Sequence, residues 1–229
     1  AASITALTGS ATDLIEAVTA NGITGLGDEA ITVDSGTATT AQANALADET
    51  SGIVTATIAE GDLATLSGLT GTGNAYAITI SDTAVNAAIL NAINNKTIND
   101  INGQNIIQIE GTAEDIATAY TAGGINGLGD EEIIFTASNI NASDLIAIDS
   151  ANSQVIDAST LTTLTGTAVD LNTAFESGGI SNLGDEDVTL TDTSLTASVL
   201  NALDDNTTGS IDANTLITPT GATVELNTT

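Results

Sequence analysis

The side chains of this chain that could do chemistry are its carboxylates, and three groups of them follow one repeated turn. The sequence reads GLGDE at residues 25–29, GLGDEE at residues 127–132 and NLGDED at residues 182–187. A hard cation such as calcium requires several carboxylate and carbonyl oxygens in one place. The turns are therefore the predicted calcium sites, and their acids are Asp28, Glu29, Asp130, Glu131, Glu132, Asp185, Glu186 and Asp187.

A second interpretation of these acids needs no ligand. Turn carboxylates can cap helices, bond to free backbone amides and keep a surface soluble. No segment of the chain matches an EF-hand loop, and the nonapeptide calcium repeat GGxGxD is missing. The sequence favours this second interpretation and leaves calcium open.

Catalysis has little support in the residue types. The chain has no His and no Cys, so a nucleophile would lack its usual base. Paired carboxylates can hydrolyse glycosides, but here acids recur at matching positions of several repeats, whereas an enzyme normally builds one site. We therefore expect no enzymatic activity and no cofactor other than calcium.

Charge and composition exclude further classes of protein. The chain has thirty acidic residues and a single basic residue, Lys96, which gives a formal charge of −29. Such a surface repels phosphates, so we expect no nucleic acid as a partner. No uninterrupted apolar run approaches the length of roughly 18 residues that a membrane span requires, so we expect no such span. An ion-rich medium outside the cell would screen the self-repulsion of the chain, and we expect an extracellular location, secreted or at the cell surface.

Internal repeats set the organisation of the chain. A glycine ends an apolar run at Gly111, Gly166 and Gly221, which are evenly spaced, and also at Gly9 and Gly61. The sequence thus predicts one continuous array over residues 1–229, with aromatics at only 2% and a thin aliphatic core. The approximate repeats are residues 1–58, 59–108, 109–163 and 164–218, with a partial repeat at 219–229.

Each repeat, of about 50 to 55 residues, splits into two strand–helix units of about 25 residues. Alternating strands and helices predict an α/β fold with a parallel sheet and right-handed crossovers. A compact doubly wound sheet would fit, but the fixed period favours a repeat solenoid with one continuous sheet. The predicted strands are Ile31–Val33, Ile78–Ile80, Ile107–Ile109, Ile133–Phe135, Leu161–Leu164 and Val188–Leu190. The predicted helices are Ala11–Val18, Thr40–Ala47, Ala84–Ile93, Ala113–Tyr120, Ala142–Ile148, Ala168–Phe175 and Thr196–Leu203. The side chains expected to face the sheet are Leu14, Leu46, Leu90, Ile116, Leu145, Leu171 and Leu200.

The stretch from Leu164 to Thr218, which includes DLNTAFESGGISNLGDEDVTLTDTSLTASVLNALDD, resembles the tandem repeats of giant cell-surface proteins of marine cyanobacteria. The resemblance covers nearly the whole chain and is weakest in the first two repeats, where IAEGDLATLSGLTGTGNAYA lacks the acidic turn. It implies a secreted, surface-associated protein with a role in motility, adhesion or protection.

Two classes of function follow from the sequence. One is an extracellular structural or adhesive segment of a large surface protein or filament, and the other is a calcium-dependent module that binds glycans or other cells. The expected partners are neighbouring repeats or identical subunits stacked end to end. The chain begins just ahead of a repeat's strand and ends inside a helix of the next repeat, so we expect an array without polar capping units.

Overall fold

The computed structural model describes residues 4–217 of the chain, which fold as two compact units. The N-terminal unit comprises Ala1–Ile107 with Ala122–Leu128, and the C-terminal unit comprises Gln108–Thr121 with Gly129–Thr229. Each unit is α/β, and each is described by itself.

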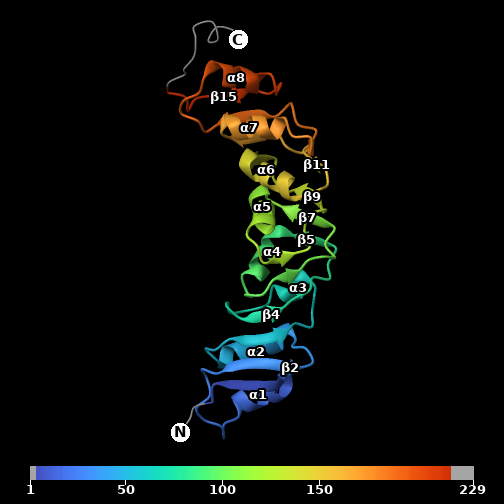
Figure 1. The fold of residues 1–229 in the computed structure, drawn as a ribbon, viewed down its shortest axis with the longest axis vertical. Coiled ribbons are helices and arrows are strands. Elements are labelled where there is room, and N and C mark those ends of the chain that lie inside the picture. Colours follow the sequence, from blue (N-terminus) through green and yellow to red (C-terminus); the bar gives the residue numbers. More distant parts are fainter. Residues whose placement is uncertain (1–3, 218–229) are drawn as a thin grey trace. The chain divides into compact units, whose positions relative to one another are not determined.

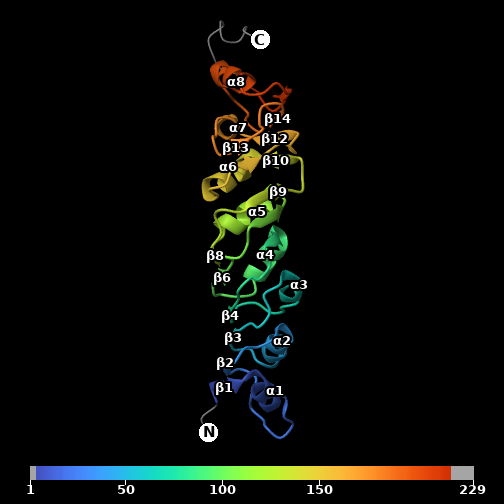
Figure 2. The same ribbon diagram turned by 90° about the vertical axis from the view of Figure 1, so that its right-hand side faces the viewer.

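The N-terminal unit alternates strands with short helices. Its elements are β1 (Ala6–Ser10), α1 (Ala11–Thr19), β2 (Ala30–Ser35), α2 (Thr40–Glu49), β3 (Val54–Thr57), α3 (Leu63–Leu66), β4 (Ala75–Ala77), β5 (Ala84–Asn86), α4 (Ala87–Asn94), β6 (Ile101–Asn102) and β8 (Ile125–Asn126). Strands β1 to β4 form one parallel sheet in chain order, and β6 pairs with β8 in a separate parallel pair. Figures 1 and 2 show these four strands stacked one after another, with α1, α2 and α3 along one side of them.

The C-terminal unit repeats this plan. Its elements are β7 (Gln108–Gly111), α5 (Ala113–Thr121), β9 (Glu132–Phe135), β10 (Asn139–Asn141), α6 (Ala142–Ala151), β11 (Ile156–Asp157), β12 (Thr163–Gly166), α7 (Ala168–Phe175), β13 (Ile180–Ser181), β14 (Asp187–Leu190), α8 (Ala197–Asp204) and β15 (Ile211–Asp212). Strands β10, β12, β14 and β15 form a four-stranded parallel sheet in that order, while β11 pairs with β13 and β7 with β9, again in parallel.

The register of these pairs measures the length of one coil, meaning one strand, its helix and the connecting turns. Ala6 pairs with Ala30, and Thr163 pairs with Asp187, so each partner lies one coil further along the chain. The other pairs within the two units have nearly the same offset, and the shortest joins β3 to β4. The coil is therefore close in length to the strand–helix unit that the sequence predicts.

Local hydrogen bonds explain where the helices begin. The Ser10 hydroxyl accepts from the Asp13 N–H at 3.2 Å and donates to the Asp13 carboxylate at 2.7 Å, just ahead of α1. This arrangement satisfies one free amide of the first turn and places a negative charge at the positive end of the helix. The same pattern starts α5 and α7, with Thr112 before Asp115 and Thr167 before Asp170. The predicted helix starts at Ala11, Ala113 and Ala168 are confirmed.

The core of each unit is aliphatic, as expected. Of the seven side chains expected to face the sheet, Leu14, Leu46, Leu90, Ile116, Leu145 and Leu171 are buried. The exception is Leu200, which lines a surface hollow with Ile211 and Ala213, while Leu203 is the fully buried leucine of α8.

Several predicted elements are wrong in detail. The strand predicted at Ile78–Ile80 is not formed, and β4 ends before it at Ala77. At this position Thr79 forms an isolated bridge to Asn102, because the Ile78 carbonyl and the Ile80 N–H both form hydrogen bonds with the backbone of Asn102. The predicted helix at Ala84 begins three residues late, because Asn86 caps α4 by accepting from the Ile89 N–H.

Other differences concern the sheet. The predicted strands Ile107–Ile109 and Leu161–Leu164 begin one and two residues later, as β7 and β12, and α3 is absent from the predictions. The continuous sheet is also wrong, because within each unit the strands are divided among separate sheets; β6, for example, is followed by a turn at residues 104–105. The parallel direction of the strands is confirmed.

Candidate functional site: the acidic turns

We call residues 25–29, 127–131 and 182–186 the first, middle and last acidic turns. The glutamate that ends each turn is buried, with exposed fractions of 0% for Glu29, 0% for Glu131 and 1% for Glu186. In each turn, Oε2 of this glutamate accepts from two backbone N–H groups, those of the glycine two residues before it and of the aspartate one residue before it. The N···O distances are 2.7 and 3.2 Å in the first turn, 2.8 and 3.1 Å in the middle turn, and 2.8 and 3.2 Å in the last turn. Each carboxylate thus folds back onto its own turn.

Backbone conformation explains why each motif begins with Gly-Leu-Gly or Asn-Leu-Gly. The first residue of the motif has φ of 84° at Gly25, 92° at Gly127 and 60° at Asn182. This left-handed region favours glycine, and asparagine is among the few other residues that enter it readily. The second glycine of each turn has φ between 134° and 145°, which residues with a Cβ rarely adopt. The turn is therefore specified by its backbone as well as by its acids.

Each turn is tied to the coil that follows it. The carbonyl of the buried glutamate accepts from a side chain 21 residues later: Thr50 Oγ1 at 2.6 Å in the first turn, Asn152 Nδ2 at 2.7 Å in the middle turn and Thr207 Oγ1 at 2.7 Å in the last turn. The carbonyl of the second glycine accepts from the N–H of the next residue of that coil, at 2.7 to 2.8 Å; the donors are Ser51, Ser153 and Thr208. Three turns far apart in the sequence therefore make the same two connections.

One atom of each buried glutamate has no partner. Oε1 of Glu29, Glu131 and Glu186 is buried and makes no hydrogen bond. A buried polar atom without a partner costs free energy, and a buried charge costs more unless it is paired. The same oxygen lacks a hydrogen-bond partner in all three turns, so this lack is a property of the turn and not of one side chain.

The remaining predicted site residues lie at the surface. Asp28, Asp130 and Asp185 lie at the outer side of their turns, and their backbone N–H groups are among those bound to the buried glutamate. Glu132 and Asp187 are the exposed first residues of β9 and β14. Within residues 4–217, no group of three or more acidic side chains has the geometry to hold a metal ion. The structure thus places the predicted residues side by side in each turn and does not join several carboxylates around one point.

Asp187 has a structural partner that the sequence does not reveal. Its Oδ1 accepts from the Ser210 hydroxyl at 2.7 Å and from the Ser210 N–H at 2.8 Å. These hydrogen bonds, the hydroxyl first, hold the pKa of the Asp187 carboxyl below its usual value of 3.8. This carboxylate connects β14 to the chain entering β15.

The middle turn contains an additional donor that sequence reasoning missed. The Tyr120 hydroxyl donates to Oε2 of Glu131 at 2.6 Å, and Asn152 Nδ2 lies 3.2 Å from the same hydroxyl. Burial, followed by the hydrogen bond to Glu131 and its charge, raises the pKa of Tyr120 well above its usual value. The only signal in the sequence is that one of the two tyrosines lies near the end of the helix that leads into this turn.

Other carboxylates cap helices of the preceding coil. Asp192 accepts from the Ala168 N–H at 2.7 Å, Glu60 from the Thr40 N–H at 2.9 Å and Asp82 from the Leu63 N–H at 2.7 Å. Each acid lies 19 to 24 residues beyond the helix start that it completes. A carboxylate in this position satisfies a free amide and interacts favourably with the helix dipole.

The second repeat, residues 59–108, has no acidic turn and uses a neutral side chain in the same place. Asn74 precedes β4 as Glu29 precedes β2, and it is buried. Its Oδ1 accepts from the Val54 N–H at 2.9 Å, so the amide pairs across to the previous strand. The buried position is thus kept while the carboxylate is lost.

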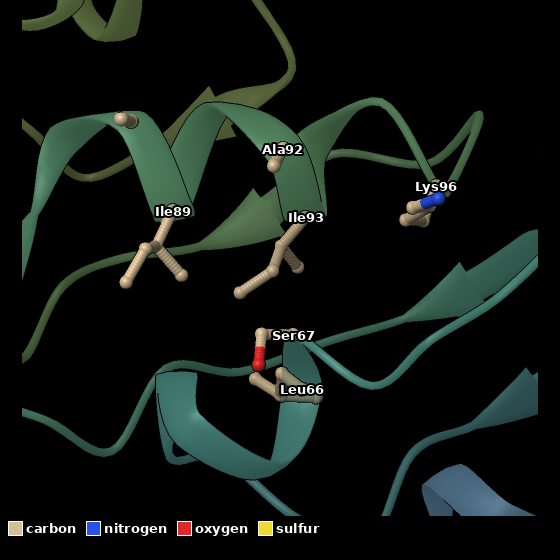
Figure 3. Close-up of a pocket in the computed structure, with 7 residues that line it drawn as sticks. Leu66, Ser67, Ile89, Ala92, Ile93 and Lys96 are labelled. Atoms are coloured by element: carbon tan, nitrogen blue, oxygen red, sulfur yellow. The ribbon is translucent and has the colours of Figure 1, made fainter.

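The same part of the N-terminal unit carries an apolar groove of about 230 Å³. It lies between α3, which is a single turn, and α4, whose Ile89 and Ile93 point toward Leu66 and Ser67 (Figure 3). Ile89 is 39% exposed because the short α3 does not cover it. Lys96 lies at one end of the groove (Figure 3).

The described residues include no helix that is long and apolar enough to cross a membrane. In comparisons with known proteins, no family model, no curated protein and no solved structure matches this chain. Its function must therefore be argued from the acidic turns and from the coils that they connect.

Proposed function

We propose that this chain is an extracellular structural or adhesive repeat segment of a large surface protein or filament, with no catalytic activity. In this proposal the strand–helix coils stack as an α/β solenoid, and the partners are neighbouring repeats or identical subunits placed end to end. The resemblance to the tandem repeats of cyanobacterial surface proteins points the same way.

The observation that carries the proposal is the repetition of the acidic turn. Three turns make the same internal hydrogen bonds and the same two bonds to the following coil. An enzyme concentrates its unusual residues in one site, whereas an architecture of stacked repeats uses the same connection again in successive repeats. The near-constant offset between paired strands within each unit supports the same conclusion.

Two measurements test this proposal. Small-angle X-ray scattering of the isolated chain, with electron microscopy of the native material, should give a rod or a filament. A compact particle of the size expected for a globular protein of 229 residues would contradict it. Antibodies raised against the chain should label intact cells, and labelling only after permeabilisation would contradict an extracellular location.

The second candidate function is a calcium-dependent module that binds glycans or other cells. It is favoured by one observation, the partnerless Oε1 of each buried glutamate. The test is binding of the chain to a glycan array and to whole cells, in calcium and in chelator. Equal binding in both conditions, or none in either, would leave the structural role as the better proposal.

A further inference from the structure

We propose that each acidic turn binds a hard divalent cation of the calcium type, and that Oε1 of Glu29, Glu131 and Glu186 is its charged ligand. The proposal concerns the same turns as the calcium-dependent candidate above. It is tested by ion binding and stability instead of adhesion, so either proposal can fail while the other stands.

The first step of the argument is the balance of charge. Three carboxylates are at most 1% exposed, and each has one oxygen bonded to two backbone amides. Amides supply partial charges only, so the buried negative charge still needs a counter-charge. The chain cannot provide one for each of three turns, because it has a single base, Lys96, which lines the groove beside α4. The counter-charge must therefore come from solution.

The second step is the geometry left around the free oxygen. Oε2 of each glutamate is occupied by its amide donors, and in the middle turn by the Tyr120 hydroxyl as well. Oε1 keeps its lone pairs and has no donor. Since this happens three times in the same hydrogen-bonding frame, the vacant acceptor is a property of the turn and not an accident of one side chain.

The third step is the chemistry of the available ligands. The turn offers only oxygen, from the buried glutamate and from the backbone carbonyls of a glycine-rich segment. Calcium accepts mixed carboxylate and carbonyl ligands in irregular geometry, whereas magnesium requires a near-ideal octahedron. Because fewer than three acidic side chains converge in any of the three described turns, carbonyls and water must complete the shell. This ligand set is typical of weak extracellular sites, with Kd on the order of 10⁻⁴ to 10⁻³ M.

The experiment measures calcium binding to the whole chain by isothermal titration, together with urea unfolding in calcium and in EDTA at matched ionic strength. We expect about three ions per chain, one for each partnerless Oε1, and a higher unfolding midpoint in calcium. Glu186→Gln should remove one ion from the stoichiometry. Asp204→Asn is the matched control, because it removes one negative charge from an exposed residue outside the turns and should leave the stoichiometry unchanged.

The same variant separates a bound cation from a bound proton. Glutamine has the shape of a protonated glutamate, so if the carboxyl holds a proton, Glu186→Gln will match or exceed the stability of the wild type in every ionic condition. That result, or an equal effect of sodium and calcium at matched ionic strength, would overturn the proposal.

Terbium emission, measured on the wild-type chain, tests the proposal even if a variant fails to fold. Terbium substitutes for calcium and emits when a nearby tyrosine is excited, and the Tyr120 hydroxyl lies 2.6 Å from Oε2 of Glu131. We expect tyrosine-sensitised emission that calcium displaces, that Tyr120→Phe abolishes and that Tyr76→Phe retains. Absence of sensitised emission from the wild type, without any effect of calcium on unfolding, would overturn the proposal.

Discussion

Replacing Gly209 by alanine should disrupt the connection between the last acidic turn and the following coil. An ideal Cβ at Gly209 would lie 2.2 Å from the Glu186 carbonyl oxygen, 2.5 Å from its carbon and 2.8 Å from the Asp187 nitrogen. All three are backbone atoms, so no side chain can rotate away. Ordinary van der Waals contact begins near 3.4 Å, and the two segments must therefore separate by about 1.2 Å.

This separation sets the size of the effect. The Thr207 Oγ1 to Glu186 carbonyl bond and the Val188 N–H to Ser210 carbonyl bond are both 2.7 Å long. Lengthened by about 1.2 Å they pass the limit of a hydrogen bond, and each contributes about 1 kcal/mol. Overpacking adds about 1 to 3 kcal/mol. We expect Gly209→Ala to lower the free energy of unfolding by about 3 to 5 kcal/mol.

Urea unfolding followed by circular dichroism measures the difference. Gly178→Ala is the matched control, since a Cβ at Gly178 meets nothing within 4 Å and its φ lies outside the left-handed region. We expect this control to stay within about 0.5 kcal/mol of the wild type. The reasoning is refuted if Gly209→Ala is no more destabilising than Gly178→Ala.

Further variants test other parts of the structure. Leu171→Ala should cost about 2 to 5 kcal/mol in urea unfolding, because it removes a fully buried side chain of α7 and leaves a cavity; a loss below about 1 kcal/mol would contradict the packing. Tyr120→Phe should cost about 1 to 3 kcal/mol by the same measurement, because it removes the third donor to the buried Glu131 carboxylate. Ser210→Ala should raise the pKa of Asp187 toward 3.8 in a titration followed by NMR. Because the folded pKa of Asp187 is depressed, the wild type should be more stable than Ser210→Ala above pH 3.8, and this difference in stability should disappear as pH falls through the folded pKa. A difference that does not depend on pH would contradict this assignment.

The sequence predicts elements well where the signal is local. The starts of α1 and α7 follow from Ser10 and Thr167, because an N-cap and the acid three residues later lie within one turn of chain. The acidic turns are also local, since glycine or asparagine supplies the left-handed backbone that begins each motif.

What the sequence does not predict depends on the next coil. The strand expected at Ile78–Ile80 alternates correctly, yet its pairing is limited by a partner, Asn102, that lies in the following coil. Glu131 and Asp130 are both acids of one turn, and nothing local distinguishes the carboxylate that is fully buried from the one that is not. Burial is decided by the backbone amides of the folded turn and, in the middle turn, by Tyr120.

The carboxylates that cap helices across coils also affect how the chain is made. The Ala168 N–H at the start of α7 is satisfied by Asp192, which lies 24 residues later. At a synthesis rate of about 5 to 20 residues per second, the acid follows the helix start by about one to five seconds. During that interval the Ala168 N–H has no carboxylate acceptor, so the start of α7 is completed only after the following coil has been synthesised. A translational pause between Ala168 and Asp192 would prolong this vulnerable period, whereas a pause just after Asp192 would give the completed coil time to settle.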